Sequence, residues 1–109
     1  MNFSPIIIVG GEPQSVFIEI LLKSIKKINN PIILISSKDI LRKNMDKFNF
    51  DFELNELNEN LTNIRKGKIN MVNINYNKFS FSKKKITSES DKFIQLSFNK
   101  AIEIIKKIN

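Results

Sequence analysis

The sequence predicts an α/β fold with a mainly parallel sheet and flanking helices, and two observations predict it. First, two aliphatic runs, PIIIV at residues 5–9 and PIILIS at residues 31–36, have the pattern of strands buried on both faces. Second, each run is followed by a segment whose apolar residues recur at helical spacing. Alternating strands and helices indicate parallel pairing through right-handed crossovers. With 109 residues, the chain has room for one domain, which we assign to residues 1–109.

The next elements follow in chain order. We expect a helix over residues 14–28, ended by the Asn-Asn-Pro sequence at 29–31. A second helix should begin near Lys38, with Ser37 as its cap, and end at Asn49. Four apolar residues then alternate with polar ones and predict a strand with one wet face near a sheet edge: Phe48, Phe50, Phe52 and Leu54.

The second half of the chain is expected to hold a loop, a strand and a long helix. Residues 55–67 read as a loop with one helical turn, and residues 69–75 as a strand. Ser88 fits the N-cap of the last helix, with Asp91 three residues later. Its apolar residues are predicted to share one face that packs on the sheet: Ile94, Phe98, Ala101, Ile102, Ile105 and Ile108.

Composition excludes several kinds of chemistry and location. The chain has no cysteine and no histidine, so disulfides, thiolate nucleophiles, imidazole bases and the usual zinc sites are excluded. No apolar run approaches the roughly 18 residues that span a bilayer, and the start lacks the basic region of a signal peptide. We therefore expect no membrane partner and a cytoplasmic location.

The net charge of +7 raises the question of a nucleic-acid partner. The basic excess lies after residue 60, and Lys83, Lys84 and Lys85 follow Phe79 and Phe81, which together could bind an anionic strand. However, lysine far outnumbers arginine, and Lys, Asn and Ile are favoured by an AT-rich genome. We therefore interpret the lysines as a solvated loop and expect no nucleic-acid partner.

The sequence GGEP at residues 10–13 interrupts the chain between the first predicted strand and helix. It is neither a phosphate loop nor a dinucleotide fingerprint, because no Lys-Ser/Thr pair and no later glycines follow. The amides of a helix start can bind an anion, but Glu12 would satisfy them itself and repel phosphate. A turn capped by Glu12 therefore fits at least as well as a ligand contact.

The wider stretch PIIIVGGEPQSVFIEILLK resembles the N-terminus of the PdxA family, the 4-hydroxythreonine-4-phosphate dehydrogenases. In that family an aliphatic strand leads into G-E-P-A-G-I-G-P-E and a helix. Gly11, Glu12, Pro13 and Glu19 match, whereas Phe17 replaces a family glycine. Phe17 falls on the apolar side of the first helix, which favours a role in the core. The segments PIILISSKDILRKNM and KKITSESDKFIQLSFNKAIEIIKK are similar to later family segments, so the resemblance spans nearly the whole chain but about the first third of a family member.

This resemblance implies part of a fold like that of the isocitrate and isopropylmalate dehydrogenases, with NAD, a divalent metal and a homodimer at full length. The family oxidises and decarboxylates a phosphorylated amino acid, 4-phosphooxy-L-threonine, in pyridoxal and pyridoxine 5'-phosphate (vitamin B6) biosynthesis. Gly10, Gly11 and Glu12 are the residues expected to contact the cofactor. The family's metal histidines and substrate residues have no counterpart in this sequence, so we expect no catalytic and no metal-binding residue here.

These implications leave two functional hypotheses open. In the first, the chain is the N-terminal segment of a larger PdxA-like dehydrogenase, a truncated product or a fragment, and alone is inactive and binds neither NAD nor metal. In the second, it is a degenerate scaffold or interaction subunit without catalysis, which rests on the exposed sheet edge that a partial α/β domain leaves.

Overall fold

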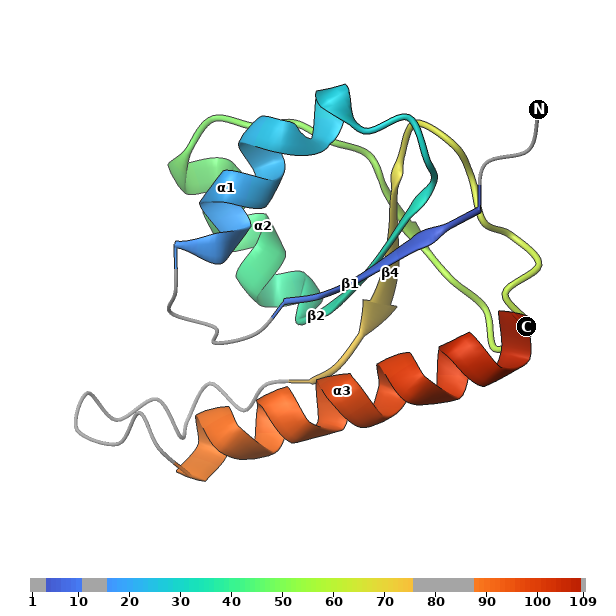
Figure 1. Ribbon diagram of the computed structural model, residues 1–109. Coiled ribbons are helices and arrows are strands. Elements are labelled where there is room, and N and C mark those ends of the chain that lie inside the picture. Colours follow the sequence, from blue (N-terminus) through green and yellow to red (C-terminus); the bar gives the residue numbers. More distant parts are fainter. Residues whose placement is uncertain (1–3, 11–15, 76–87, 109) are drawn as a thin grey trace.

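A computed structural model describes residues 4–10, 16–75 and 88–108, and the statements below concern these residues. The elements run in the order β1 (Ile6–Val9), α1 (Phe17–Ser24), η1 (Ile25–Lys27), β2 (Ile32–Ser36), α2 (Lys38–Lys47), β3 (Leu54–Glu56), β4 (Ile69–Asn73) and α3 (Ser88–Ile108). The four described strands form one sheet in the order β1-β2-β4-β3, and every neighbouring pair is parallel (Figure 1). The predicted α/β class with a parallel sheet is confirmed.

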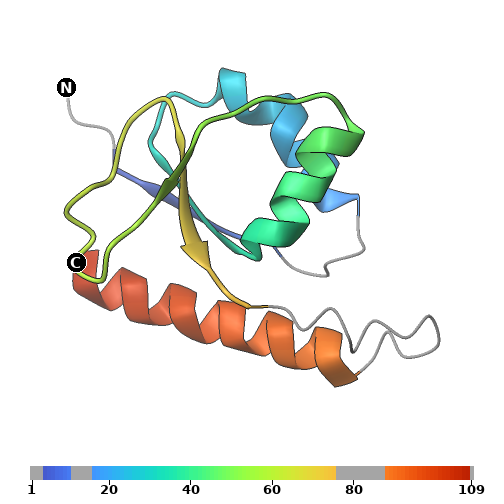
Figure 2. The ribbon, with the colours of Figure 1, turned by 180° about the vertical axis from the view of Figure 1, so that it is seen from behind.

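The sheet lies between two layers of helices. α1 and α2 cover one face, and α3 covers the other (Figures 1 and 2). Because side chains alternate along a strand, β2 sends Leu34 into the core beneath α1 and α2, and Ile33 and Ile35 into the core above α3. The connection 57–68 also packs on the α3 face, through Leu57, Leu61 and Ile64.

The two aliphatic strands differ in burial, which the sequence did not predict. β2 is buried along its whole length, as expected. The first strand was predicted to be buried on both faces, and β1 does contribute to both cores, through Ile8 on one face and Ile7 and Val9 on the other. These three residues are only half-buried and Ile6 is exposed, because β1 lies at the edge of the described sheet. An edge strand has a neighbour on one side, so similar runs of aliphatic residues acquire different surroundings.

The third strand is shorter and later than predicted. Phe48 ends α2 rather than starting a strand, and Asn49 has a positive φ of 60°. The rings of Phe50 and Phe52 stack at 5.7 Å between centroids in an irregular segment and pack against the core beneath α1 and α2. The alternating aromatic residues thus reflect the packing of two phenylalanine rings on the core and not a strand. The strand itself is Leu54–Glu56, at the edge of the described sheet.

The three helices lie where the sequence predicted them, but some of their bounds differ from the prediction. The first helix was predicted over residues 14–28, but α1 covers Phe17–Ser24 and continues as the 3-10 turn η1. Ser37 caps α2 as predicted, since its Oγ accepts a hydrogen bond of 3.3 Å from the amide of Ile40. The last helix already includes Ser88, which was expected to precede it.

The buried face of α3 also differs from the prediction. Phe93, Ser97, Ala101 and Ile104 are buried against the sheet. Phe98, Ile102 and Ile105, which the sequence placed on the packed face, are 54%, 51% and 45% exposed. The packed face is rotated relative to the predicted one, because apolar residues occupy a wide arc of this helix. No described helix has the length and apolar character that crossing a membrane requires.

Candidate functional site

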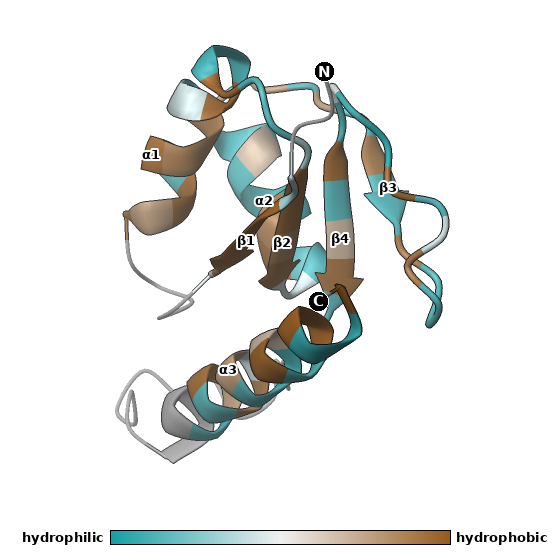
Figure 3. Ribbon diagram, turned by 45° about the vertical axis from the view of Figure 1, so that its right-hand side comes forward, coloured by the Kyte–Doolittle hydropathy of each residue, from teal (hydrophilic) through white to brown (hydrophobic). Residues whose placement is uncertain are grey.

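The candidate site is the carboxyl edge of the sheet, where parallel α/β sheets bind their ligands. The four described strands are all parallel and end at this edge in the order β1, β2, β4 and β3 (Figure 3). Gly10 follows β1, Ser37 follows β2, and Asn73 ends β4. The sequence predicted Gly10 at this edge, and the structure brings it next to Ser36.

Gly10 is required by close packing between two strand ends. It is buried, and its amide donates a hydrogen bond of 2.9 Å to the carbonyl oxygen of Ile35. A Cβ on residue 10 would lie 2.7 Å from Oγ and 2.9 Å from Cβ of Ser36, closer than side chains approach one another. The missing side chain at Gly10 is therefore explained by the neighbouring strand, and its assignment to a cofactor stays a prediction.

The start of α2 is occupied by side chains of the protein itself. Ser37 is 3% exposed and accepts from the amide of Ile40. Asn73 Oδ1 accepts a hydrogen bond of 2.8 Å from the amide of Lys38, the first residue of α2. These two acceptors satisfy amides that would otherwise be available to an anion at the helix start. An anion bound here would have to displace Asn73.

Asn73 joins β4 to the beginning of α2. Besides its contact with Lys38, its Nδ2 donates a hydrogen bond of 3.1 Å to Oδ1 of Asn75, and the amide of Ile74 donates 2.9 Å to the carbonyl oxygen of Ser36. Sequence reasoning missed this residue because asparagine is abundant throughout the chain. The available signal was its place near the carboxyl end of the strand predicted over residues 69–75.

The topology places a switch point between β2 and β4. The chain leaves β2 toward α2, and the next helix after β4 is α3, on the opposite face of the sheet (Figures 1 and 2). Neighbouring parallel strands whose connections go to opposite faces leave a crevice where ligands bind. Ser36, Ser37 and Asn73 border this point, whereas Gly10 lies one strand away.

The charges near this edge belong to ion pairs. Lys38 Nζ lies 3.6 Å from Oε2 of Glu56, at the end of β3. A shallow hollow of about 370 Å³ separates the end of β4 from α3 and is bordered by Asn75, Lys100 and Glu103, of which Lys100 and Glu103 pair at 3.5 Å. These side chains are hydrogen-bonding and charged groups that can bind a polar ligand.

Another hollow of about 370 Å³ lies at the opposite, amino end of the strands. Ile28, Phe52 and Ile69 form its apolar wall, and Lys68 and Glu53 pair at 2.6 Å beside it. Lys68 donates to the carboxylate and lowers the pKa of Glu53 below its ordinary value. This end of a parallel sheet is not where α/β proteins bind ligands, so we do not assign it a function.

The described residues do not provide the metal site that the resemblance implies. Among residues 4–10, 16–75 and 88–108, no group of three or more aspartate or glutamate side chains is placed to hold a metal ion. Gly11 and Glu12, the other two predicted cofactor contacts, lie outside the described residues, as do Phe79, Phe81 and Lys83 to Lys85.

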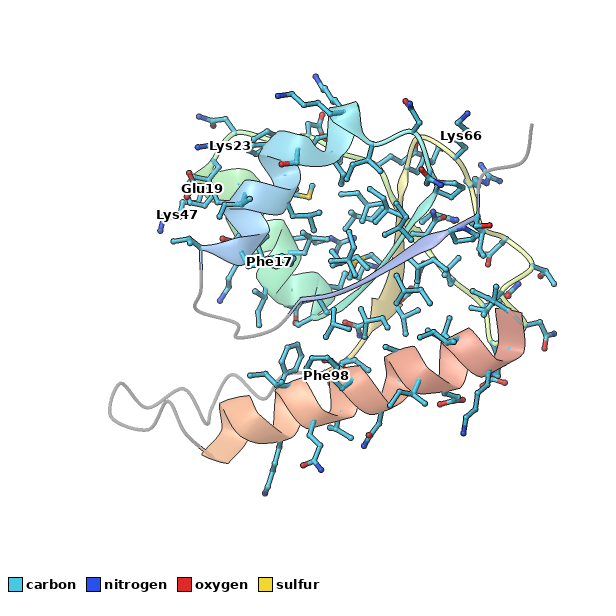
Figure 4. The ribbon with its side chains drawn as sticks, viewed as in Figure 1. Phe17, Glu19, Lys23, Lys47, Lys66 and Phe98 are labelled. Carbon is cyan, nitrogen blue, oxygen red and sulfur yellow. The ribbon has the colours of Figure 1, made fainter. Side chains whose placement is uncertain are left out.

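Phe17 stands where the PdxA family has a glycine, and it lies among the residues that the structure describes. It is half-buried at the start of α1 and packs against the core shared by α1 and α2 (Figure 4). This contact confirms that Phe17 contributes to the core, as its position on the apolar side of the helix predicted.

Comparison with known proteins gives no relative from which a function can be transferred. No protein-family profile, no curated protein and no solved structure matches this chain.

Proposed function

We propose that this chain is the N-terminal part of a PdxA-like, NAD-dependent 4-hydroxythreonine-4-phosphate dehydrogenase. The observation that carries the proposal is the position of the Gly-Glu-Pro motif in the order of elements. Residues 11–13 follow Gly10 at the carboxyl end of β1 and precede α1, in a sheet whose described strands are all parallel. The motif thus stands between a strand and a helix, as in the family that the sequence resembles.

In this proposal the chain supplies scaffold rather than catalytic groups. Ser36, Ser37 and Asn73 hold the carboxyl ends of β2 and β4 and the start of α2 in one hydrogen-bonded arrangement. The sequence contains no histidine, so the metal-binding histidines of the family would have to come from another part of the protein. We therefore expect no dehydrogenase activity from these 109 residues alone.

Sequencing the transcript beyond codon 109 tests this proposal directly. We expect the same or an adjacent reading frame to encode a segment with metal-binding histidines. Co-expression of the chain with that segment, in a bacterial strain that lacks its PdxA enzyme, should restore growth without pyridoxine. Each part alone should fail to do so. A transcript without such a segment would overturn the proposal.

A second candidate function is that of an interaction subunit without catalysis. The observation that favours it is the combination of an edge strand, β1, with exposed apolar residues on α3. Sheet edges and apolar patches are surfaces that bind other chains. A stable complex that forms in a strain without any dehydrogenase segment would favour this function over the first.

A further inference from the structure

We draw no further inference here: the strongest candidate, the groove that the described residues form between α3 and the carboxyl ends of β3 and β4, where two adjoining hollows share Asn73 and Lys100, belongs to the site already described, and because both of its lysines, Lys100 and Lys107, pair with Glu103, its charges select no one class of ligand.

Discussion

The side-chain amide of Asn55 donates a hydrogen bond of 2.8 Å to Oδ1 of Asn70, which joins β3 to β4 through two asparagine side chains. Asn70 is completely buried, and the same Oδ1 also accepts from the amide of Arg65 at 2.8 Å. Its Nδ2 donates to the carbonyl oxygens of Ile32 and Arg65, both at 2.8 Å. One buried amide thus fixes the connection 57–68 to two strands of the sheet.

Replacing Asn70 with alanine is expected to destabilise the protein by about 2–4 kcal/mol, because it leaves several buried donors and acceptors without partners. Urea denaturation followed by circular dichroism measures the change in the free energy of unfolding. Asn60→Ala is the control, an exposed asparagine of the same connection whose loss should change stability by less than about 0.5 kcal/mol. Equal effects of the two substitutions would contradict a structural role for the buried amide.

Gly10→Ala is expected to destabilise the protein by about 1–3 kcal/mol, because the added Cβ meets Ser36 at 2.7 Å. The residue in contact is known, so a double-mutant cycle can isolate the cause. Ser36→Gly removes the opposing side chain, and the pair Gly10→Ala with Ser36→Gly should cost less than the sum of the two single substitutions. Additive costs would show that the strain arises elsewhere.

The sequence predicted those elements whose signals are local. PIILIS became the buried strand β2, and Ser37 became the cap of α2, because burial of a central strand and capping of a helix depend on nearby residues. The orientation of α3 depends on distant partners. Phe98 and Ile104 are equally apolar in the sequence, and only packing against the sheet buries one and exposes the other.

The candidate site could be predicted in part for the same reason. Gly10 was placed correctly at the carboxyl edge, since a glycine after an aliphatic run marks a strand end. Asn73 was missed, because its contact with Lys38 joins residues that are distant in the sequence, in a chain rich in asparagine. The buried role of Asn70 was missed likewise, although an amide inside a predicted strand is itself unusual.

The isolated chain is expected to bind no NAD. Phe17 fills the core at the start of α1, at a position where the PdxA family has a glycine, and Gly10 packs against Ser36. Isothermal titration of the chain with NAD should give no saturable heat. Phe17→Gly removes the ring and restores the family glycine. We expect this variant to bind no NAD either, because the rest of the NAD site is missing from the chain. Saturable micromolar affinity of the unaltered chain would contradict our interpretation of Phe17.

The ion pair between Glu53 and Lys68 predicts a pH-dependent contribution to stability. The hydrogen bond from Lys68 and its positive charge lower the pKa of Glu53, so the folded state binds a proton there less readily than the unfolded state. The stabilisation is therefore present above the ordinary carboxyl pKa of the unfolded chain and is lost as pH falls through the lower folded value.

Thermal unfolding of the protein and of Glu53→Gln across pH measures this contribution. The difference in Tm should be small and greatest near neutral pH, and it should vanish in acid once the pH falls below the lowered folded pKa of Glu53. It should also shrink in high salt, because the carboxylate of Glu53 is exposed to solvent. Glu59→Gln, at an exposed glutamate of the connection 57–68, is the control. A Tm difference that persists in acid would show that Glu53 stabilises the fold through packing of its side chain rather than through its charge.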